Sequence, residues 1–159
     1  MTPSTPPLLA TEIPPSAKKT NYPEPFAAQV VGREKRKLGN WFGLTNFGVN
    51  LTELAPGAFS ALYHAHTRQD ELIYVLEGEP TLIWGEAEYV LAPGQCVGFK
   101  AGAGAAHQLV NRTDRVVRFL EVGDRTPNDR VDYPHDDLQA MLTSAGQWQF
   151  LHKDGRAYG

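Results

Sequence analysis

The chain has 159 residues, 42% of them hydrophobic and 21% charged, which suits one globular domain with a substantial core. A formal net charge of −3 gives no basic field that would recruit nucleic acid or an anionic membrane, so we expect neither partner. There is no run of about eighteen apolar residues and no signal-peptide pattern, so we expect a cytoplasmic protein. The single cysteine, Cys96, excludes an internal disulfide, and we expect it to be buried as a small apolar residue.

Residues 1–25 hold seven of the twelve prolines, a composition that favours extended backbone. This segment cannot build a core of its own, so we expect it to lie on a sheet surface, within the subunit or across the interface of a homodimer. The charged run at 33–37 could be read as an anion patch. Short runs of mixed sign more often form a solvated loop or edge strand, and we predict that.

From about residue 41, short β-branched and aromatic runs alternate with glycine and proline, which is typical of an all-β domain. We predict eight strands, at residues 47–54, 59–66, 72–77, 80–84, 87–91, 96–99, 108–111 and 116–122. Eight strands suit a double-sheet jelly roll. The only clear helical stretch is 137–142, with Asp136 or Asp137 as its N-cap.

Two histidines stand two residues apart, at His64 and His66. In an extended strand, side chains at this spacing share a face and lie about 7 Å apart, so both imidazoles can reach one ion. Glu71 follows, and His107 lies some forty residues further on. If the fold brings these strands together, three imidazoles and a carboxylate make a metal site.

A second carboxylate, Asp70, competes with Glu71 for the place in that site. Strand alternation puts Glu71 on the same face as Ile73 and Val75, while Asp70 falls in the preceding turn. We therefore assign Glu71 to the site.

The spacing around these residues forms two motifs. The first is Gly57, six residues, His64-x-His66, four residues, Glu71, six residues and Gly78, and the second is Gly102-x-Gly104, two residues, His107, three residues and Asn111. Together they resemble the two motifs of the cupin superfamily, over residues 48–123. The second motif has Gly102 where proline is usual, which loosens the turn before His107.

The resemblance implies a cupin double-stranded β-helix (jelly roll) barrel, with His64, His66, Glu71 and His107 as ligands of a divalent metal ion. We divide the chain into an extended proline-rich segment 1–25, a cupin barrel 26–134, and a C-terminal helix and tail 135–159. Further stretches are similar to uncharacterised bacterial single-domain cupins, some provisionally called sugar or sugar-phosphate isomerases: 48–50, 123–125, 131–134 and 152–155.

Other polar residues fit structural roles better. His135 and His152 lie in polar surroundings, so we exclude both from the site. We expect the following residues near the cavity to be structural: Asn50, Tyr63, Trp84, Lys100, Gln108 and Asn111. Imidazole and carboxylate donors suit Zn, Fe, Mn or Ni, so the ligand set does not choose the metal.

The sequence thus predicts a metal-binding cupin that acts on or binds a small polar metabolite. Our first hypothesis is a sugar or sugar-phosphate isomerase, and this hypothesis rests on the resemblance. A metal-dependent oxygenase and a non-catalytic binding or sensor protein are the alternatives. The isomerase needs a base that is not a ligand, for which Tyr74 and Glu77 are the candidates, and the lack of a clearer base favours the binding protein.

Overall fold

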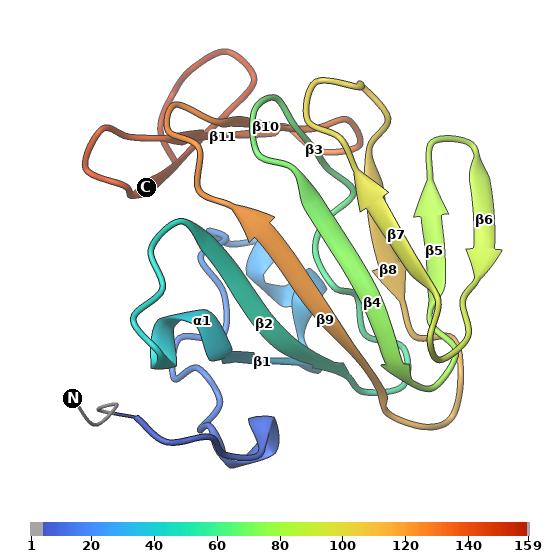
Figure 1. Ribbon diagram of the computed structural model, residues 1–159. Coiled ribbons are helices and arrows are strands. Elements are labelled where there is room, and N and C mark those ends of the chain that lie inside the picture. The colour runs from blue at the N-terminus through green and yellow to red at the C-terminus, as the bar shows by residue number, and fades with distance from the viewer. Residues whose placement is uncertain (1–4, 159) are drawn as a thin grey trace.

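The computed structural model describes residues 5–158, and most of its regular structure is β-strand (Figure 1). The strands are β1 (Arg33–Lys37), β2 (Phe47–Leu54), β3 (Ala65–His66), β4 (Glu71–Glu77), β5 (Thr81–Trp84), β6 (Ala87–Val90), β7 (Cys96–Phe99), β8 (His107–Val110), β9 (Val117–Asp124), β10 (Arg130–Tyr133), β11 (Leu138–Leu142) and β12 (Trp148–Leu151). The helices are η1 (Ala10–Glu12), η2 (Phe26–Val30) and α1 (Leu38–Trp41). None of the helices in residues 5–158 is long and apolar enough to cross a membrane.

One layer is an antiparallel five-stranded sheet in the order β1-β2-β9-β4-β7. Its inner face carries the fully buried Leu54, Val75, Val117 and Phe119, which pack with Leu109 from the opposite layer. These residues alternate along their strands with outward side chains, as the period of two requires. The charged run 33–37 is confirmed as an edge strand, because β1 lies at one end of this sheet.

The opposite layer contains two smaller sheets, β6-β5-β8 and β12-β11-β10-β3. Residues 59–64 join them through isolated bridges between Phe59 and Val110 and between His64 and His107. The prediction of one strand over 59–66 was too long, since only β3 is regular there. One reason is local: the Ser60 hydroxyl accepts the Leu109 N–H at 2.9 Å, where a regular ladder would use a backbone carbonyl. Over the described residues the sheets remain separate, and we detect no closed barrel.

The predicted helix over 137–142 was wrong, because this segment forms strand β11. Leu138 and Ala140 are buried on one face while β10 and β12 pair with its two edges. Asp137 caps no helix and instead accepts hydrogen bonds from His152 Nδ1 and the Lys153 N–H. Tertiary pairing therefore overrides a weak local helical preference.

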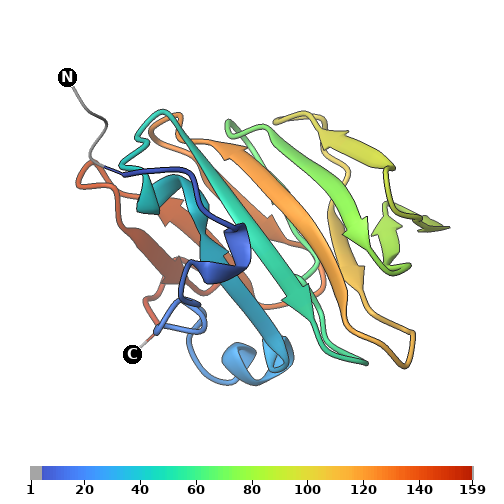
Figure 2. The same ribbon diagram turned by 60° about the horizontal axis from the view of Figure 1, so that its bottom comes forward.

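The described part of the N-terminal segment, from residue 5 on, contacts β1 within the subunit. Ile13 is 3% exposed, and the Ser16 N–H donates to the Lys35 carbonyl at 2.8 Å on the free edge of β1. Tyr22 packs edge-on against Tyr133 and Phe150 of the opposite layer. The segment therefore joins the two layers, and Figure 2 shows it in dark blue beside β1 and β2.

The outer face of the five-stranded sheet is apolar along β4. Leu72, Tyr74 and Leu76 are each more than two-fifths exposed there. Cys96 pairs with Tyr74 in register and is also exposed, so the expectation of a buried cysteine was wrong. Alternation along β7 places the thiol on the outer face, where the opposite layer does not cover it.

Candidate metal centre

Three strands and one bridge bring His64, His66, Glu71 and His107 together, and we call these four residues the His/Glu cluster. Glu71 opens β4, His107 opens β8, and His66 ends β3. His64 and His107 exchange backbone hydrogen bonds of 3.1 and 2.8 Å, so the two residues stand directly opposite each other on adjacent antiparallel segments. The rings of His64 and His107 are 4.6 Å apart between centroids.

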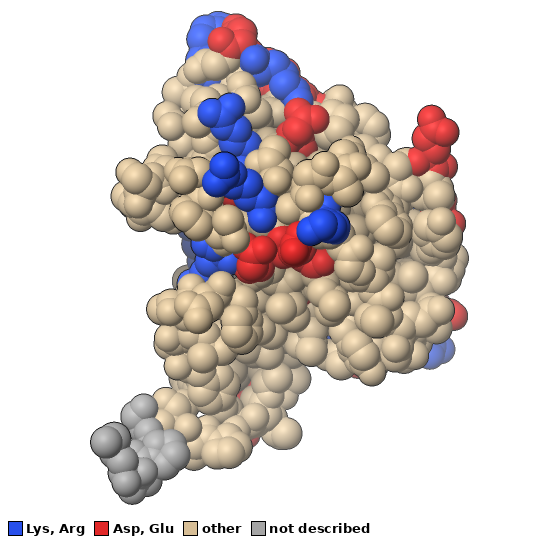
Figure 3. Space-filling model, turned by 45° about the horizontal axis from the view of Figure 1, so that its top comes forward, with Lys and Arg blue, Asp and Glu red and all other residues tan. Residues whose placement is uncertain are grey.

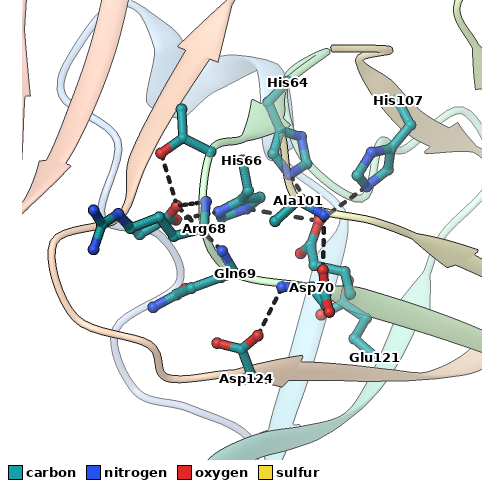
Figure 4. Close-up of polar contacts among 12 residues, drawn as sticks. His64, His66, Arg68, Gln69, Asp70, Ala101, His107, Glu121 and Asp124 are labelled. Carbon is teal, nitrogen blue, oxygen red and sulfur yellow. Dashed lines mark hydrogen bonds and ion pairs between the residues drawn. The ribbon is translucent and has the colours of Figure 1, made fainter. Parts of the chain in front are cut away.

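The rings of His64, His66 and His107 point toward a common region (Figure 4), and one oxygen of Glu71 faces all three. Its Oε2 lies 3.5 Å from His64 Nε2, 3.6 Å from His66 Nε2 and 3.1 Å from His107 Nε2. This oxygen is buried without a hydrogen-bond partner among the described residues. The donor atoms of His64, His66 and Glu71 lie within 4.8 Å of one another and could hold a metal ion. A buried carboxylate oxygen without a donor costs free energy, and a cation there would remove that cost.

Hydrogen bonds on the far side of two rings orient their donor atoms toward the cluster. His64 Nδ1 lies 2.8 Å from the Leu62 carbonyl, and His66 Nδ1 lies 2.5 Å from Asp129 Oδ2. A carbonyl can only accept, so the proton of neutral His64 resides on Nδ1, and a carboxylate favours the same tautomer for His66. In both residues Nε2 then presents its lone pair to the cluster, as metal-binding histidines do.

Asp129 is completely buried and holds the loop that precedes β4. Its Oδ1 accepts the Arg68 N–H at 2.7 Å, the Gln69 N–H at 3.3 Å and the Thr67 hydroxyl at 3.3 Å. No sequence pattern points to Asp129. It lies 63 positions after His66 in a polar loop, and no spacing rule connects the two.

The electrostatics favour a charged carboxylate and a neutral His107. Burial works to raise the pKa of Glu71, but its close contacts with the imidazoles of His107 and His64 lower that pKa well below its usual range. Burial lowers the pKa of His107 more than its contact with Glu71 raises it. Burial also opposes a charge on His66, yet the hydrogen bond to Asp129 and the neighbouring carboxylates raise the pKa of His66.

A cavity of about 680 Å³ opens from the cluster between the two layers. Across β2, β9 and β4, the residues Gly48, Gly123 and Glu71 stand opposite one another, so two glycines leave space beside the carboxylate. In the next row toward the core, Asn50 and Glu121 face the same side. The cavity therefore contains a second carboxylate one row away from the cluster.

The other predicted residues lie outside the cluster. Asp70 lies in the irregular loop before β4, where its N–H donates to Asp124 Oδ2 at 2.8 Å and its Oδ1 accepts the Ala101 N–H at 2.7 Å. Tyr74 and Glu77, the candidate bases, are exposed on β4, and Glu77 pairs with Arg118 at 2.5 Å. Neither base candidate lines the cavity, so both assignments were wrong.

Most of the residues that we expected to be structural make structural contacts. Asn111 is completely buried and donates to the carbonyls of Leu54 and Arg115 at 2.9 and 2.6 Å. Tyr63 donates to the Gly85 carbonyl at 3.0 Å and stacks on His135. Trp84 packs edge-on against Phe99, Lys100 is exposed, and Gln108 lines a separate cavity of about 190 Å³ with His135. His152 pairs with Asp137 at 2.7 Å, away from the cluster.

Comparisons with known proteins agree with this fold and cluster. The cupin domain family matches residues 50–123. The chain is 39% identical to a protein from Silicibacter pomeroyi described as a sugar phosphate isomerase from the cupin superfamily, with a TM-score of 0.86 over 97% of both chains. It is 32% identical to a protein from Acidithiobacillus ferrooxidans provisionally described as a sugar phosphate isomerase, with a TM-score of 0.71 over 80% of both chains.

A more distant structure shares the fold alone. A polyketide cyclase from Streptomyces resistomycificus is 22% identical, with a TM-score of 0.62 over 76% of this chain and 79% of its own. No curated protein matches the chain. Taken together, the family match and the extent of the first similarity show that the chain belongs to the cupin superfamily.

Proposed function

We propose that this cupin is a metal-dependent isomerase that interconverts the aldose and ketose forms of a sugar or sugar phosphate. The observation that carries the proposal is a carboxylate, Glu121, in the same cavity as the His/Glu cluster but outside it. The descriptions of the two relatives at 39% and 32% identity support the same reaction class.

His64, His66, Glu71 and His107 are the residues that would hold the metal. Three imidazoles and one carboxylate are a donor set that suits Zn, Fe, Mn or Ni. When bound, such an ion supplies Lewis-acid chemistry, which polarises the carbonyl and the adjacent hydroxyl of a sugar. The hydrogen bonds of His64 to Leu62 and of His66 to Asp129 prepare two of these side chains for that task.

Glu121 is the general base in this proposal. Lys35 Nζ lies 2.6 Å from Glu121 Oε2, and Asn50 Nδ2 lies 3.5 Å from the same oxygen, so two neighbours orient the carboxylate. It takes the proton from the carbon next to the carbonyl and returns it to the former carbonyl carbon. The hydroxyl proton moves to the carbonyl oxygen, so the reaction needs no oxidant, water or leaving group.

Two tyrosines on the cavity wall fit a different role. Burial raises the pKa of Tyr22 and, more strongly, that of Tyr133. Both phenols therefore keep their protons at neutral pH. They can donate hydrogen bonds to sugar hydroxyls but are poor bases, which leaves Glu121 as the better candidate.

The test is proton exchange in D₂O. Purified protein loaded in turn with Zn, Mn, Fe and Ni is incubated with a panel of aldoses, ketoses and their phosphates, and NMR follows deuterium at the carbon next to the carbonyl. We expect exchange and turnover in the unchanged protein, loss of both in Glu121→Gln with metal content retained, and loss of metal in His64→Ala. Glu77→Gln, on the outer face, is the matched control and should stay active.

The proposal fails if no sugar or sugar phosphate exchanges a proton with any of these metals. It also fails in its choice of base if Glu121→Gln turns over as fast as Glu77→Gln. Uptake of dioxygen by the iron-loaded protein would favour the oxygenase instead.

A further inference from the structure

The cavity wall opposite β10–β12 is basic. Its basic residues are Lys18, Lys19, Arg33, Lys35, Lys37 and Arg125. Alternation along β1 places Arg33, Lys35 and Lys37 on the cavity side, whereas Arg36 turns to the other face and pairs with Glu34 and Glu53. Figure 3 shows blue basic side chains gathered around a group of red acidic ones on this face.

Half of these cations are already engaged. Lys35 pairs with Glu121, Lys19 lies 3.8 Å from Glu34, and Arg33 donates to the carbonyls of Ser60 and Lys19. Lys18, Lys37 and Arg125 have no carboxylate within ion-pair distance in the part of the chain that the structure describes. The wall therefore holds positive charge that the protein itself leaves uncompensated.

The acids beside these cations, Glu121 and Asp124, have other partners. Lys35 pairs with Glu121 at 2.6 Å. Asp124 accepts the N–H groups of Asp70 and Thr126, at 2.8 and 2.7 Å. Among the described residues, neither carboxylate forms an ion pair with Lys37 or Arg125, so both cations remain available to an anion.

Arg125 is held in place beside the cluster. It follows β9 directly, and one of its terminal nitrogens donates to Asn40 Oδ1 at 2.8 Å. Its guanidinium lies over Gly48, where a Cβ would be 3.7 and 3.8 Å from two of its nitrogens. Gly48 stands in the same cross-strand row as Glu71, two strands away, which is about 10 Å between Cα atoms.

Lys37 lies at the end of the neighbouring row. It stands opposite Asn50 on β2, and Asn50 stands opposite Glu121 on β9. Across these two rows, from β4 toward β1, the cavity wall carries the His/Glu cluster, then the proposed base Glu121, and then the unpaired cations Arg125 and Lys37. The separation of about 10 Å between Glu71 and Gly48, over which Arg125 lies, matches the distance from the carbonyl end to the phosphate end of a five- or six-carbon sugar phosphate.

We infer that Arg125 and Lys37 form an anion subsite that binds the phosphate of a phosphorylated sugar while its carbonyl end reaches the His/Glu cluster. The placement of the sugar end rests on the proposed function. A guanidinium fork binds a phosphate through two parallel hydrogen bonds, and a lysine adds a second positive charge. A sugar acid would offer the same kind of anionic end through a carboxylate, so the experiment compares the two.

The test is isothermal titration of the full-length, metal-loaded protein with inorganic phosphate, ribose 5-phosphate, ribonate and ribose. We expect the phosphorylated sugar to bind more tightly than ribose or ribonate. Arg125→Gln should weaken both inorganic phosphate and ribose 5-phosphate by about tenfold to a hundredfold, because it removes hydrogen bonds to a charged group. Lys37→Gln should weaken them less, and neither variant should change metal content or ribose binding.

The matched control is Arg115→Gln, which removes the same charge from a side chain that is 90% exposed and lies outside the cavity. If Arg125→Gln binds phosphate as well as Arg115→Gln does, the subsite is refuted. Phosphate that binds the metal instead of Arg125 would give this same result. Tighter binding of ribonate than of ribose 5-phosphate would overturn the choice of phosphate.

The two proposals fail separately. Phosphate binding that depends on Arg125 without any proton exchange would keep the subsite and refute the isomerase. Isomerisation of unphosphorylated sugars, unaffected by Arg125→Gln, would keep the isomerase and refute the subsite.

Discussion

At the scale of single residues, the hydrogen bond between His66 and Asp129 connects the cluster to the loop before β10. Asp129 fixes which nitrogen of His66 carries the proton and also holds the backbone of Arg68 and Gln69. Groups that orient a metal-binding histidine typically change metal affinity by about 10- to 100-fold when they are removed. Asp129 should therefore matter almost as much as a ligand.

The first prediction concerns Asp129→Asn. This variant keeps an acceptor oxygen but removes the charge, so we expect its affinity for Zn or Mn to fall by about 10- to 100-fold at pH 8. Competition with a chromophoric chelator measures the affinity. Asp132→Asn, in the next strand and paired with Lys153, is the control and should bind metal like the unchanged protein. Equal affinities of the two variants would contradict the role given to Asp129.

The second prediction is a pH dependence of stability set by Tyr133. Burial raises the pKa of this phenol well above 10, while in the unfolded chain it titrates near about 10. Above that pH the unfolded state loses the proton and the folded state keeps it, so the free energy of unfolding falls as pH rises. This one group accounts for a fall of up to about 1.4 kcal/mol per pH unit.

Tyr133→Phe removes that proton, so the free energy of unfolding of this variant should fall less as pH rises. Urea unfolding at pH 8 and at pH 11 measures the difference in the free energy of unfolding between the two pH values for each protein. Tyr89→Phe, at an exposed tyrosine of β6, serves as the control. If Tyr133→Phe and Tyr89→Phe lose equal stability between the two pH values, burial of Tyr133 has no such effect.

At the scale of elements, the N-terminal segment acts as part of the folded domain. It buries Ile13 and pairs one backbone N–H with β1. Deleting residues 1–16 should lower the free energy of unfolding by about 2 kcal/mol, the value for exposing one such side chain. For a chain of this size, that loss corresponds to a melting temperature about 4–8 °C lower.

Calorimetry on two deletions checks this third prediction. Deleting residues 1–9 leaves Ile13 and Ser16 in place and should preserve the melting temperature, because Leu9 is largely exposed. Equal melting temperatures for the two deletions would show that residues 10–16 add no stability.

The sequence predicts an element well where its signal is local. Strands β2 and β7 have the predicted bounds, because short apolar runs bounded by glycine and proline turn signals mark strands. Strand β11 was missed because its stability comes from β10 and β12, which its own five residues do not reveal. One reason for the break in 59–66 is the Ser60 hydroxyl, which accepts the Leu109 N–H, and no hydrophobic period in the sequence encodes that contact.

The same distinction holds for the site. His64, His66, Glu71 and His107 follow a fixed spacing, and the fold brings all four together. Glu121, Arg125 and Asp129 follow no such spacing, since each reaches the cavity or the cluster through the pairing of distant strands and loops. The motif spacing thus predicted which four residues come together, and it contained no signal for the groups around them.

At the scale of the whole molecule, the apolar outer face of the five-stranded sheet is not covered along β4 by any other described part of the chain. Leu72, Tyr74 and Leu76 stand exposed on that face along β4, the strand next to the edge strand β7. Contiguous apolar surface of this kind usually marks an interface. We therefore predict a homodimer in which a second copy covers the outer face.

Light scattering coupled to size exclusion tests this fourth prediction. The unchanged protein should have the mass of a dimer, and Tyr74→Glu should shift it toward the monomer, because a buried carboxylate without a partner is costly. Tyr89→Glu places the same charge on an exposed tyrosine of β6 and should remain dimeric. A monomeric unchanged protein, or dimers of equal stability in both variants, would contradict the interface.

The cavity is assembled from two kinds of sequence. The stretch 50–123 that matches the cupin family contains the whole His/Glu cluster, whereas Lys18, Lys37 and Arg125 of the basic wall and Trp148 and Phe150 of the opposite wall lie outside it. On the two proposals above, the reacting groups and the groups that recognise the anionic end of the substrate lie in separate parts of the chain. A protein engineer could therefore aim to change the bound metabolite by grafting the terminal segments of one relative onto the central strands of another, with the metal-holding strands left unchanged.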